Sequence, residues 1–136
     1  MTRYMLDTNT VSHFLRSHPT VTARILEVPM ASLCISAITQ GELLFGLAKR
    51  PSAKALHIAV RELLRRVDSL PWDNAVAENY GTARPRMAQA GKVLAPLDML
   101  IAAHALFEDA VLVTNDQAFR QMTGLKMEDW TVALPR

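Results

Sequence analysis

Two acidic residues stand at or shortly beyond the ends of short apolar runs, where a carboxylate is placed for chemistry rather than for solubility. Asp7 follows the run Tyr4–Leu6, and Asp116 follows the run Val111–Val113 after two polar residues. If both runs are strands of a parallel sheet, both acids lie beyond the strand carboxyl ends, where open α/β sheets bind ligands. Each acid could instead simply cap the helix that follows it, because Asp is a favoured N-cap residue. From the sequence alone both interpretations stay open.

Two further acids, Glu42 and Asp98, fall within apolar helical segments. In the helix expected after Ser36, Glu42 has Ile38 four residues before it and Phe45 three residues after it, which places it on or beside the apolar stripe. An inward carboxylate is costly unless it is paired or bound to a metal. A salt bridge to an arginine is the simpler alternative. Asp98 opens the most apolar helix, where it could bind a metal or merely interact with the helix dipole.

A cluster of these four acids would suit one kind of chemistry. Mg²⁺ and Mn²⁺ are hard cations that prefer oxygen ligands. Three or four carboxylates can hold one or two such ions and still leave room for water and a phosphate. A bound ion lowers the pKa of water towards neutrality, so no histidine or cysteine nucleophile is needed. The pattern therefore favours metal-assisted hydrolysis of a phosphate ester.

The elements that would position these acids alternate between strands and helices. We expect strands at residues 4–6, 33–35, 67–72 and 111–113, with a last edge strand near 130–134. We expect helices at residues 8–15, 21–26, 36–49, 52–66, 73–90, 97–107 and 116–122, with a kink or break at Pro85. This alternation predicts an α/β fold with a mostly parallel sheet, formed by one domain over residues 1–136.

Composition adds broad limits. A chain of 136 residues, half of them hydrophobic, is large enough for a real core. The single cysteine, Cys34, excludes an intrachain disulfide and fits a reducing compartment. The N-terminus lacks a signal-peptide pattern, and no apolar run approaches the roughly 18 residues of a membrane span. We therefore expect a soluble, cytoplasmic protein, and its net charge of +2 says little about nucleic acid binding.

Four short segments, taken together in this order and spacing, resemble a PIN domain. They are Leu6-Asp7-Thr8-Asn9, the helix start Ser36 to Glu42, the segment Asp98-Met-Leu-Ile-Ala-Ala-His-Ala, and Thr114-Asn115-Asp116. More narrowly, the chain resembles the VapC type of toxin ribonuclease from bacterial toxin–antitoxin pairs, and the resemblance covers nearly its whole length. No single segment is very specific.

The resemblance implies a fold, an activity and a partner. The fold would be a three-layer α/β/α sandwich around a central, mostly parallel sheet. The activity would be that of a metal-dependent endoribonuclease, using Mg²⁺ or Mn²⁺ to cut structured RNA such as tRNA or rRNA and leaving a 5′-phosphate and a 3′-hydroxyl. The partner would be a VapB-like antitoxin that blocks the site, in a homodimer or a toxin–antitoxin hetero-oligomer.

The resemblance also assigns roles to residues. The catalytic acids would be Asp7, Glu42, Asp98 and Asp116, with Asp7, Asp98 and Asp116 as metal ligands. Supporting hydrogen bonds would come from Thr8, Asn9, Thr114 and Asn115. In one respect the chain departs from the family pattern, because Arg84-Pro85-Arg86 interrupts the helix before the third acid. The candidate RNA contacts near that loop are Arg84, Arg86 and Lys92.

Other functions remain open at this stage. A metal-dependent phosphatase could use Asp7 as its nucleophile, although such enzymes typically have a second acid where Asn9 stands. A non-catalytic PIN-like module could bind RNA or protein, although it would usually lack one or two of the acids. The acid cluster alone does not separate RNA from DNA as the substrate. His104, inside an apolar helix, is interpreted as a core residue rather than a ligand.

Overall fold

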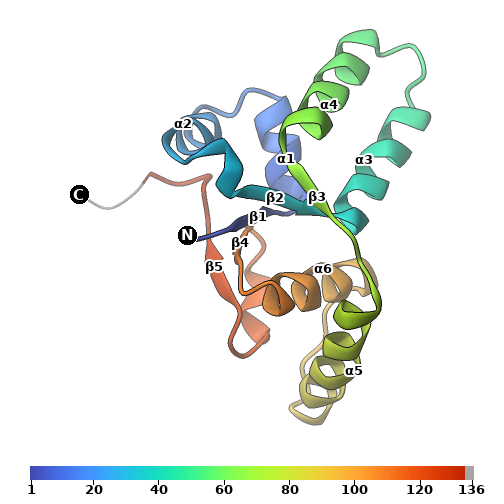
Figure 1. The fold of residues 1–136 in the computed structure, drawn as a ribbon, viewed down its shortest axis with the longest axis vertical. Coiled ribbons are helices and arrows are strands. Elements are labelled where there is room, and N and C mark those ends of the chain that lie inside the picture. Colours follow the sequence, from blue (N-terminus) through green and yellow to red (C-terminus); the bar gives the residue numbers. More distant parts are fainter. Residues whose placement is uncertain (134–136) are drawn as a thin grey trace.

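The computed structural model describes residues 1–133 of the chain. Its strands and helices alternate as the sequence predicts (Figure 1). The strands are β1 (Tyr4–Leu6), β2 (Leu33–Ser36), β3 (Asp68–Leu70), β4 (Val111–Val113) and β5 (Lys126–Glu128). The helices are α1 (Thr8–Leu15), α2 (Pro19–Glu27), α3 (Ala37–Ala48), α4 (Lys54–Arg66), α5 (Asn74–Gln89) and α6 (Pro96–Phe107), and short 3₁₀ turns lie at η1 (Met30–Ser32) and η2 (Gln117–Gln121).

The five strands form one sheet in the order β3-β2-β1-β4-β5, and all four pairings are parallel. Tyr4 in β1 lies opposite both Leu33 of β2 and Val111 of β4. The carboxyl ends of β1 and β4 are therefore neighbours, and the N–H of Asp7 donates to the carbonyl of Val113 at 3.1 Å. The predicted parallel sheet is confirmed, and it places the residues after β1 and β4 side by side.

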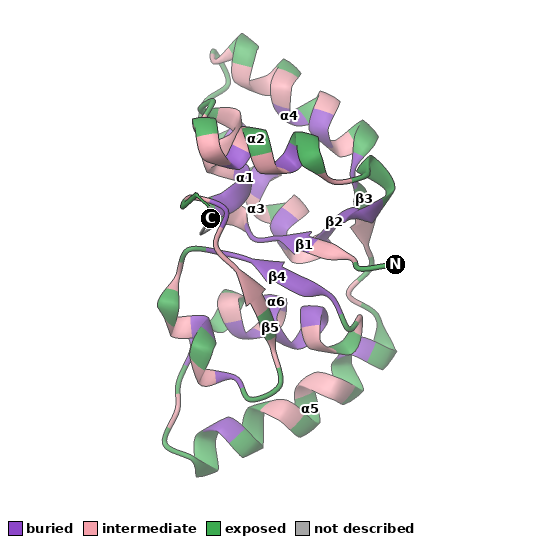
Figure 2. Cartoon of the chain, turned by 90° about the vertical axis from the view of Figure 1, so that its left-hand side faces the viewer, coloured by how far each residue is buried: buried purple, intermediate pink, exposed green. Residues whose placement is uncertain are grey.

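Helices cover both faces of the sheet, so the three-layer sandwich is confirmed. In Figure 1, α1 to α4 lie above the sheet and α5 and α6 lie below it. Each face has its own apolar core: Leu6, Val11 and Val60 belong to the upper one. Met5 and Ile101 belong to the lower one. Figure 2 shows that buried residues concentrate in the three central strands, β1, β2 and β4, and on the inner faces of the helices.

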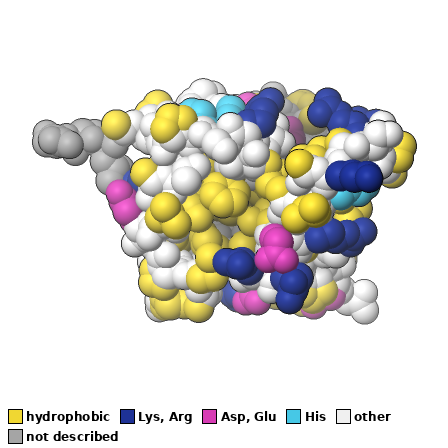
Figure 3. Space-filling view, turned by 90° about the horizontal axis from the view of Figure 1, so that it is seen from above, with side chains coloured by type: hydrophobic (Ala, Val, Ile, Leu, Met, Phe, Trp, Pro, Cys, Tyr) yellow, Lys and Arg dark blue, Asp and Glu magenta, His cyan; other side chains and the backbone are white. Residues whose placement is uncertain are grey.

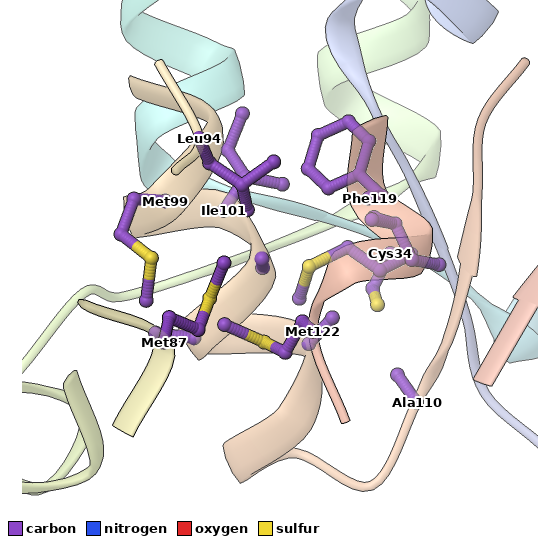
Figure 4. Packing of buried hydrophobic residues seen from close by; sticks show 13 residues of the cluster. Cys34, Met87, Leu94, Met99, Ile101, Ala110, Phe119 and Met122 are labelled. Atoms are coloured by element: carbon purple, nitrogen blue, oxygen red, sulfur yellow. The ribbon is translucent and has the colours of Figure 1, made fainter. Parts of the chain in front are cut away.

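The lower core is rich in sulfur-containing side chains. Figure 4 shows Met87 and Met99 on one side of this cluster, Cys34 and Phe119 on the other, and Met122 between them. Burial raises the pKa of the Cys34 thiol to about 11. Cys34 is therefore a neutral core residue and not a nucleophile.

Helix α6 is the most apolar helix and lies under the sheet. His104 within it is 0% exposed, and its Nδ1 forms a 2.8 Å hydrogen bond with Oγ of Ser36. The interpretation of His104 as a core residue is confirmed. None of the helices within residues 1–133 combines the length and apolar content needed to cross a membrane.

Of the kink or break predicted at Pro85, the break is wrong, because α5 runs from Asn74 through Pro85 to Gln89. Proline removes one backbone donor and crowds the carbonyl four residues before it. That position is Gly81, which is exposed, so its carbonyl can bond to water. Buried Val76 and Met87 hold the helix against the rest of the protein on either side of Pro85. Packing thus outweighs the local cost of the proline.

The last strand is also displaced from its predicted place. It covers Lys126–Glu128 and pairs with β4, whereas the prediction placed it near 130–134. Residue 134 lies outside the described residues. After β5, Oδ1 of Asp129 accepts hydrogen bonds from the N–H and the hydroxyl of Thr131, which turns the chain. Trp130 is 2% exposed and packs into the upper core, so its apolar character reflects burial rather than a strand.

Candidate active site

The four predicted acids come from different elements and are expected to meet at the carboxyl edge of the sheet. Burial first, and then the charges of Asp116, Asp7 and Glu42, raise the pKa of Asp98. For these charges to act on Asp98, each of the three carboxylates must lie near enough for its charge to reach Asp98. Asp7, Glu42 and Asp116 therefore lie in the electrostatic neighbourhood of Asp98, and the shared site remains a prediction.

Asp7 is the most enclosed of the four, at 3% exposure. Burial is the largest cause that raises its pKa, and the charge of Asp116 adds to it. Hydrogen bonds from Thr114 and Thr10 act in the opposite direction. Oδ1 of Asp7 also accepts the N–H of Thr10 at 2.7 Å and so caps α1. Asp7 can therefore cap α1 and also belong to the acid site, because capping uses only Oδ1 and leaves Oδ2 for the site.

Asp116 combines the same two tasks. Its Oδ1 accepts the N–H of Ala118 at 2.9 Å and caps η2. Its own N–H donates to Oγ1 of Thr114 at 3.0 Å. Thr114 is 1% exposed and also hydrogen bonds to Asp7, so it joins the acids that follow β1 and β4.

Glu42 lies in α3, on the border between the buried and the exposed face. Its neighbour Leu43 is buried, whereas Phe45, expected on the same apolar stripe, is 64% exposed. The hydroxyl of Thr8 donates to Oε1 of Glu42 at 2.6 Å. Within residues 1–133 no salt bridge involves Glu42, so the arginine partner considered from the sequence is not found there.

Asp98 lies in the first turn of α6, which begins at Pro96. The N-cap residue is Ala95, whose side chain cannot accept a hydrogen bond, so Asp98 does not serve as the cap. Every cause that shifts the pKa of Asp98 raises it. A half-buried carboxylate in such surroundings has a stored electrostatic cost that a bound cation would relieve.

Of the predicted supporting residues, the structure brings Thr8 and Thr114 to the acids. Asn9 and Asn115 are exposed, and Nδ2 of Asn115 lies 3.4 Å from Nε2 of His13. Sequence reasoning missed Thr10, whose hydroxyl donates to the carbonyl of Val113 at 2.8 Å. Thr10 could have been found from its position three residues after Asp7, because the backbone N–H at that position bonds to the side chain of an Asp N-cap.

The predicted RNA contacts lie around the end of α5. Arg84 hydrogen bonds to the hydroxyl of Tyr80 and lies over its ring, 5.7 Å from the centroid. Arg86 and Lys92 line a cavity of about 270 Å³ that also touches Leu106 of α6. None of the four acids lines this cavity.

The acids suit a divalent cation by chemistry, although they do not form a closed cage. Within residues 1–133 no three Asp, Glu, His or Cys side chains converge closely enough to hold an ion on their own. Mg²⁺ usually keeps several waters and is bound through one or two carboxylates plus substrate phosphates, so a closed cage is not required. Burial first, and neighbouring carboxylates second, raise the pKa of Asp7 and Asp98, and a bound cation would offset both effects. The residues present therefore fit such an ion.

Comparison with known proteins identifies the class. The PIN domain family model matches residues 4–125. A tRNA(fMet)-specific endonuclease VapC from Shigella flexneri is 30% identical over 132 residues, which cover 96% of this chain and 100% of that protein. A ribonuclease VapC2 from Rickettsia felis is 31% identical over 130 residues, covering 93% and 97%. The chain therefore belongs to the PIN domain family and, within it, to the VapC-type proteins.

Solved structures agree with this placement. DNA-bound VapBC from Salmonella typhimurium contains a chain that superposes with a TM-score of 0.87 at 32% identity, covering 96% of this chain and 99% of that one. VapBC2 from Rickettsia felis, bound to a DNA fragment from its promoter, gives a TM-score of 0.85 at 29% identity. It covers 95% of this chain and 99% of that one.

Proposed function

We propose that this protein is a Mg²⁺- or Mn²⁺-dependent endoribonuclease and the toxin of a toxin–antitoxin pair. The proposal is supported by the neighbouring carboxyl ends of β1 and β4, which Asp7 and Asp116 follow, and by the effect of Asp7, Glu42 and Asp116 on the pKa of Asp98. The relatives named as VapC endonucleases and ribonucleases, similar over nearly the whole chain, support the choice of RNA over DNA.

In this proposal the acids divide the work. Asp7, Asp98 and Asp116 would hold the ion, which when bound would polarise the phosphate and activate water. Thr114 and Thr10 keep Asp7 in place through hydrogen bonds. Glu42 has Oε1 engaged by a threonine hydroxyl, which leaves Oε2 to accept a proton from the attacking water.

The substrate would be a structured RNA such as a tRNA or rRNA, cut to leave a 5′-phosphate and a 3′-hydroxyl. Asn9 and Asn115 are exposed next to the acids and would hydrogen bond to the RNA or to its waters. Arg84, Arg86 and Lys92 would contact phosphates farther along the RNA. Action on such RNA would take place in the cytoplasm.

The partner would be a VapB-like antitoxin. The solved neighbours are complexes of a toxin and an antitoxin, some of them on DNA, and their toxin chains share the fold of this chain. We expect this protein likewise to form a homodimer or a toxin–antitoxin hetero-oligomer.

Cleavage of natural RNA tests the proposal. Antitoxin-free protein would be incubated with total bacterial RNA in Mg²⁺, in Mn²⁺ and in chelator, beside Asp98→Asn prepared identically. We expect discrete products with 5′-phosphate ends that disappear with chelator and with the substitution. Absence of any metal-dependent cleavage by folded protein, or equal cleavage by Asp98→Asn, would contradict it.

A further inference from the structure

A groove between α1, α3 and α4 runs from the acid site to a group of basic side chains. Its volume is about 280 Å³, and Thr8 and Glu42 form part of its wall. Arg16, Lys49 and Arg50 also line it. We propose that this groove binds the RNA strand next to the cleaved phosphate, an inference that rests on the proposed function.

The groove is continuous with the acid site because the two share side chains. The hydroxyl of Thr8 and the carboxylate of Glu42, joined at 2.6 Å, belong to both. One helical turn beyond Glu42, Gly46 lines the groove without a side chain, and a Cβ built there would meet nothing within 4 Å. An RNA strand whose phosphate lies at the acids can therefore continue into open space along α3.

The basic side chains of the groove are available for a ligand. Arg16, Lys49 and Arg50 are exposed, and within residues 1–133 none of them forms a salt bridge. By contrast, Arg65 and Arg66 on the outer face of α4 both pair with Glu62, at 3.0 and 3.5 Å. Cations without partners beside an acidic metal site are what a phosphate backbone requires.

Local contacts order the Lys49 side chain and the Arg50 backbone at the groove. Nζ of Lys49 lies 4.7 Å from the centroid of the Phe45 ring, a cation–π geometry. Nε2 of His57 hydrogen bonds to the carbonyl of Arg50 at 2.9 Å and secures the turn between α3 and α4. The cations are therefore presented by ordered backbone rather than by a free loop.

The lining favours RNA as the occupant. Among residues 1–133, Glu42 is the only acid that lines it, and Glu42 lies at the end where the proposed cation would neutralise negative charge. Leu43, Leu47 and Val60 also line the groove and give it an apolar floor that a base can contact. Figure 3 looks down on the end of the molecule where α3 and α4 lie and shows Lys and Arg side chains gathered around exposed hydrophobic ones.

Binding, measured apart from cleavage, tests the groove. In an Asp98→Asn background that does not cut, labelled bulk bacterial tRNA would be titrated in Mg²⁺ over a range of salt concentrations. The groove variant carries Arg16→Gln, Lys49→Gln and Arg50→Gln. The matched control removes the same charge from the outer face of α4 through Arg61→Gln, Arg65→Gln and Arg66→Gln. Melting temperatures confirm that both proteins are folded.

We expect the groove variant to bind tRNA about 10- to 100-fold more weakly. The slope of log K against log salt concentration should become shallower by about 2, which is roughly 0.7 for each of the three lost phosphate contacts. The control should lose far less. Gly46→Leu, which fills the groove without changing charge, should weaken binding and leave the salt dependence unchanged.

Equal losses in the two triple variants, or full tRNA binding by the groove variant, would overturn the proposal. Loss of antitoxin binding with unchanged tRNA binding would assign the groove to the protein partner instead and would also overturn it. The nuclease proposal can fail on its own. A chain that binds tRNA through the groove but never cleaves RNA would contradict the proposed activity and leave the groove proposal intact.

Discussion

The hydroxyl of Thr8 donates a 2.6 Å hydrogen bond to Oε1 of Glu42, and this bond joins the first turn of α1 to the middle of α3. It fixes one carboxylate oxygen and leaves the other free. The same hydroxyl lies 3.4 Å from Oγ1 of buried Thr39, which holds its orientation. Glu42 is thus oriented by its neighbours rather than by an arginine.

Thr8→Val removes this donor and keeps the shape of the side chain. We expect RNA cleavage, or the affinity for Mn²⁺, to fall by about 10- to 100-fold, the usual effect of losing a residue that orients a metal-site acid. Thr8→Ser should restore most of the loss. Thr22→Val is the control, because the buried hydroxyl of Thr22 has no hydrogen-bond partner within residues 1–133. Full activity in Thr8→Val would show that the bond is not needed.

Asp98→Asn should make the metal-free protein more stable. Burial and three neighbouring acids raise the pKa of Asp98, so its ionised form is disfavoured in the folded state. The cost applies at neutral pH and disappears as the pH falls to the ordinary carboxyl range, about 3.9. In chelator the melting temperature of Asp98→Asn should therefore exceed that of the parent at pH 7, and the gain should shrink towards acid pH.

Added Mn²⁺ should reverse the order of stability. The parent gains stability by mass action with its ligand, whereas Asp98→Asn should gain much less. Melting curves at increasing Mn²⁺ measure both effects. A parent protein that is unaffected by Mn²⁺ and an Asp98→Asn variant that is less stable in chelator would together contradict the electrostatic account.

The sequence predicts the strand ends well because their signal is local. Asp7 follows β1 and Asp116 follows β4 closely, and parallel pairing of β1 with β4 then brings them together. What it does not predict are contacts between elements. The bond from Thr8 to Glu42 and the bond from Thr10 to the carbonyl of Val113 depend on how α1 packs, which no local pattern specifies.

The last strand and the helix around Pro85 were predicted wrongly for the same reason: contacts between elements decide both. Residues Lys126–Glu128 have little intrinsic preference for a strand, yet they pair with β4 because the edge of the sheet is available to them. Trp130 looks like part of a strand but is buried against Tyr4, with ring centroids 5.3 Å apart. In α5, tertiary packing on both sides of Pro85 overrides the local breaking tendency.

Pro85→Ala should therefore stabilise the protein. Proline inside a helix is about 3 kcal/mol less favourable than alanine, so we expect the free energy of unfolding to rise by about 1–3 kcal/mol. Urea denaturation measures the change. Gly81→Ala on the same helix is the companion variant, with an expected gain of about 0.5–1 kcal/mol. A loss of stability in Pro85→Ala would mean that the proline has a structural role in α5.

His104 should contribute to acid sensitivity. Burial lowers its pKa, while the charge of Asp73 acts the other way and Oε1 of Glu108 lies 4.0 Å from Nε2. The folded state thus binds a proton less tightly than the unfolded chain. Its contribution to stability is complete above the ordinary histidine value of about 6.5 and is lost as the pH falls below it. His104→Gln should show a smaller drop in melting temperature from about pH 7.5 to about pH 5.5. An unchanged drop would contradict this.

The most direct test of the central claim, that four acids form one cation site, is diffraction from crystals grown with Mn²⁺ at a wavelength where manganese scatters anomalously. We predict an anomalous peak beside the carboxylates of Asp7 and Asp98, with Asp116 and Glu42 around it, and loss of that peak in Asp98→Asn. A peak elsewhere on the chain, or full binding of Mn²⁺ by Asp98→Asn at another position, would contradict the account.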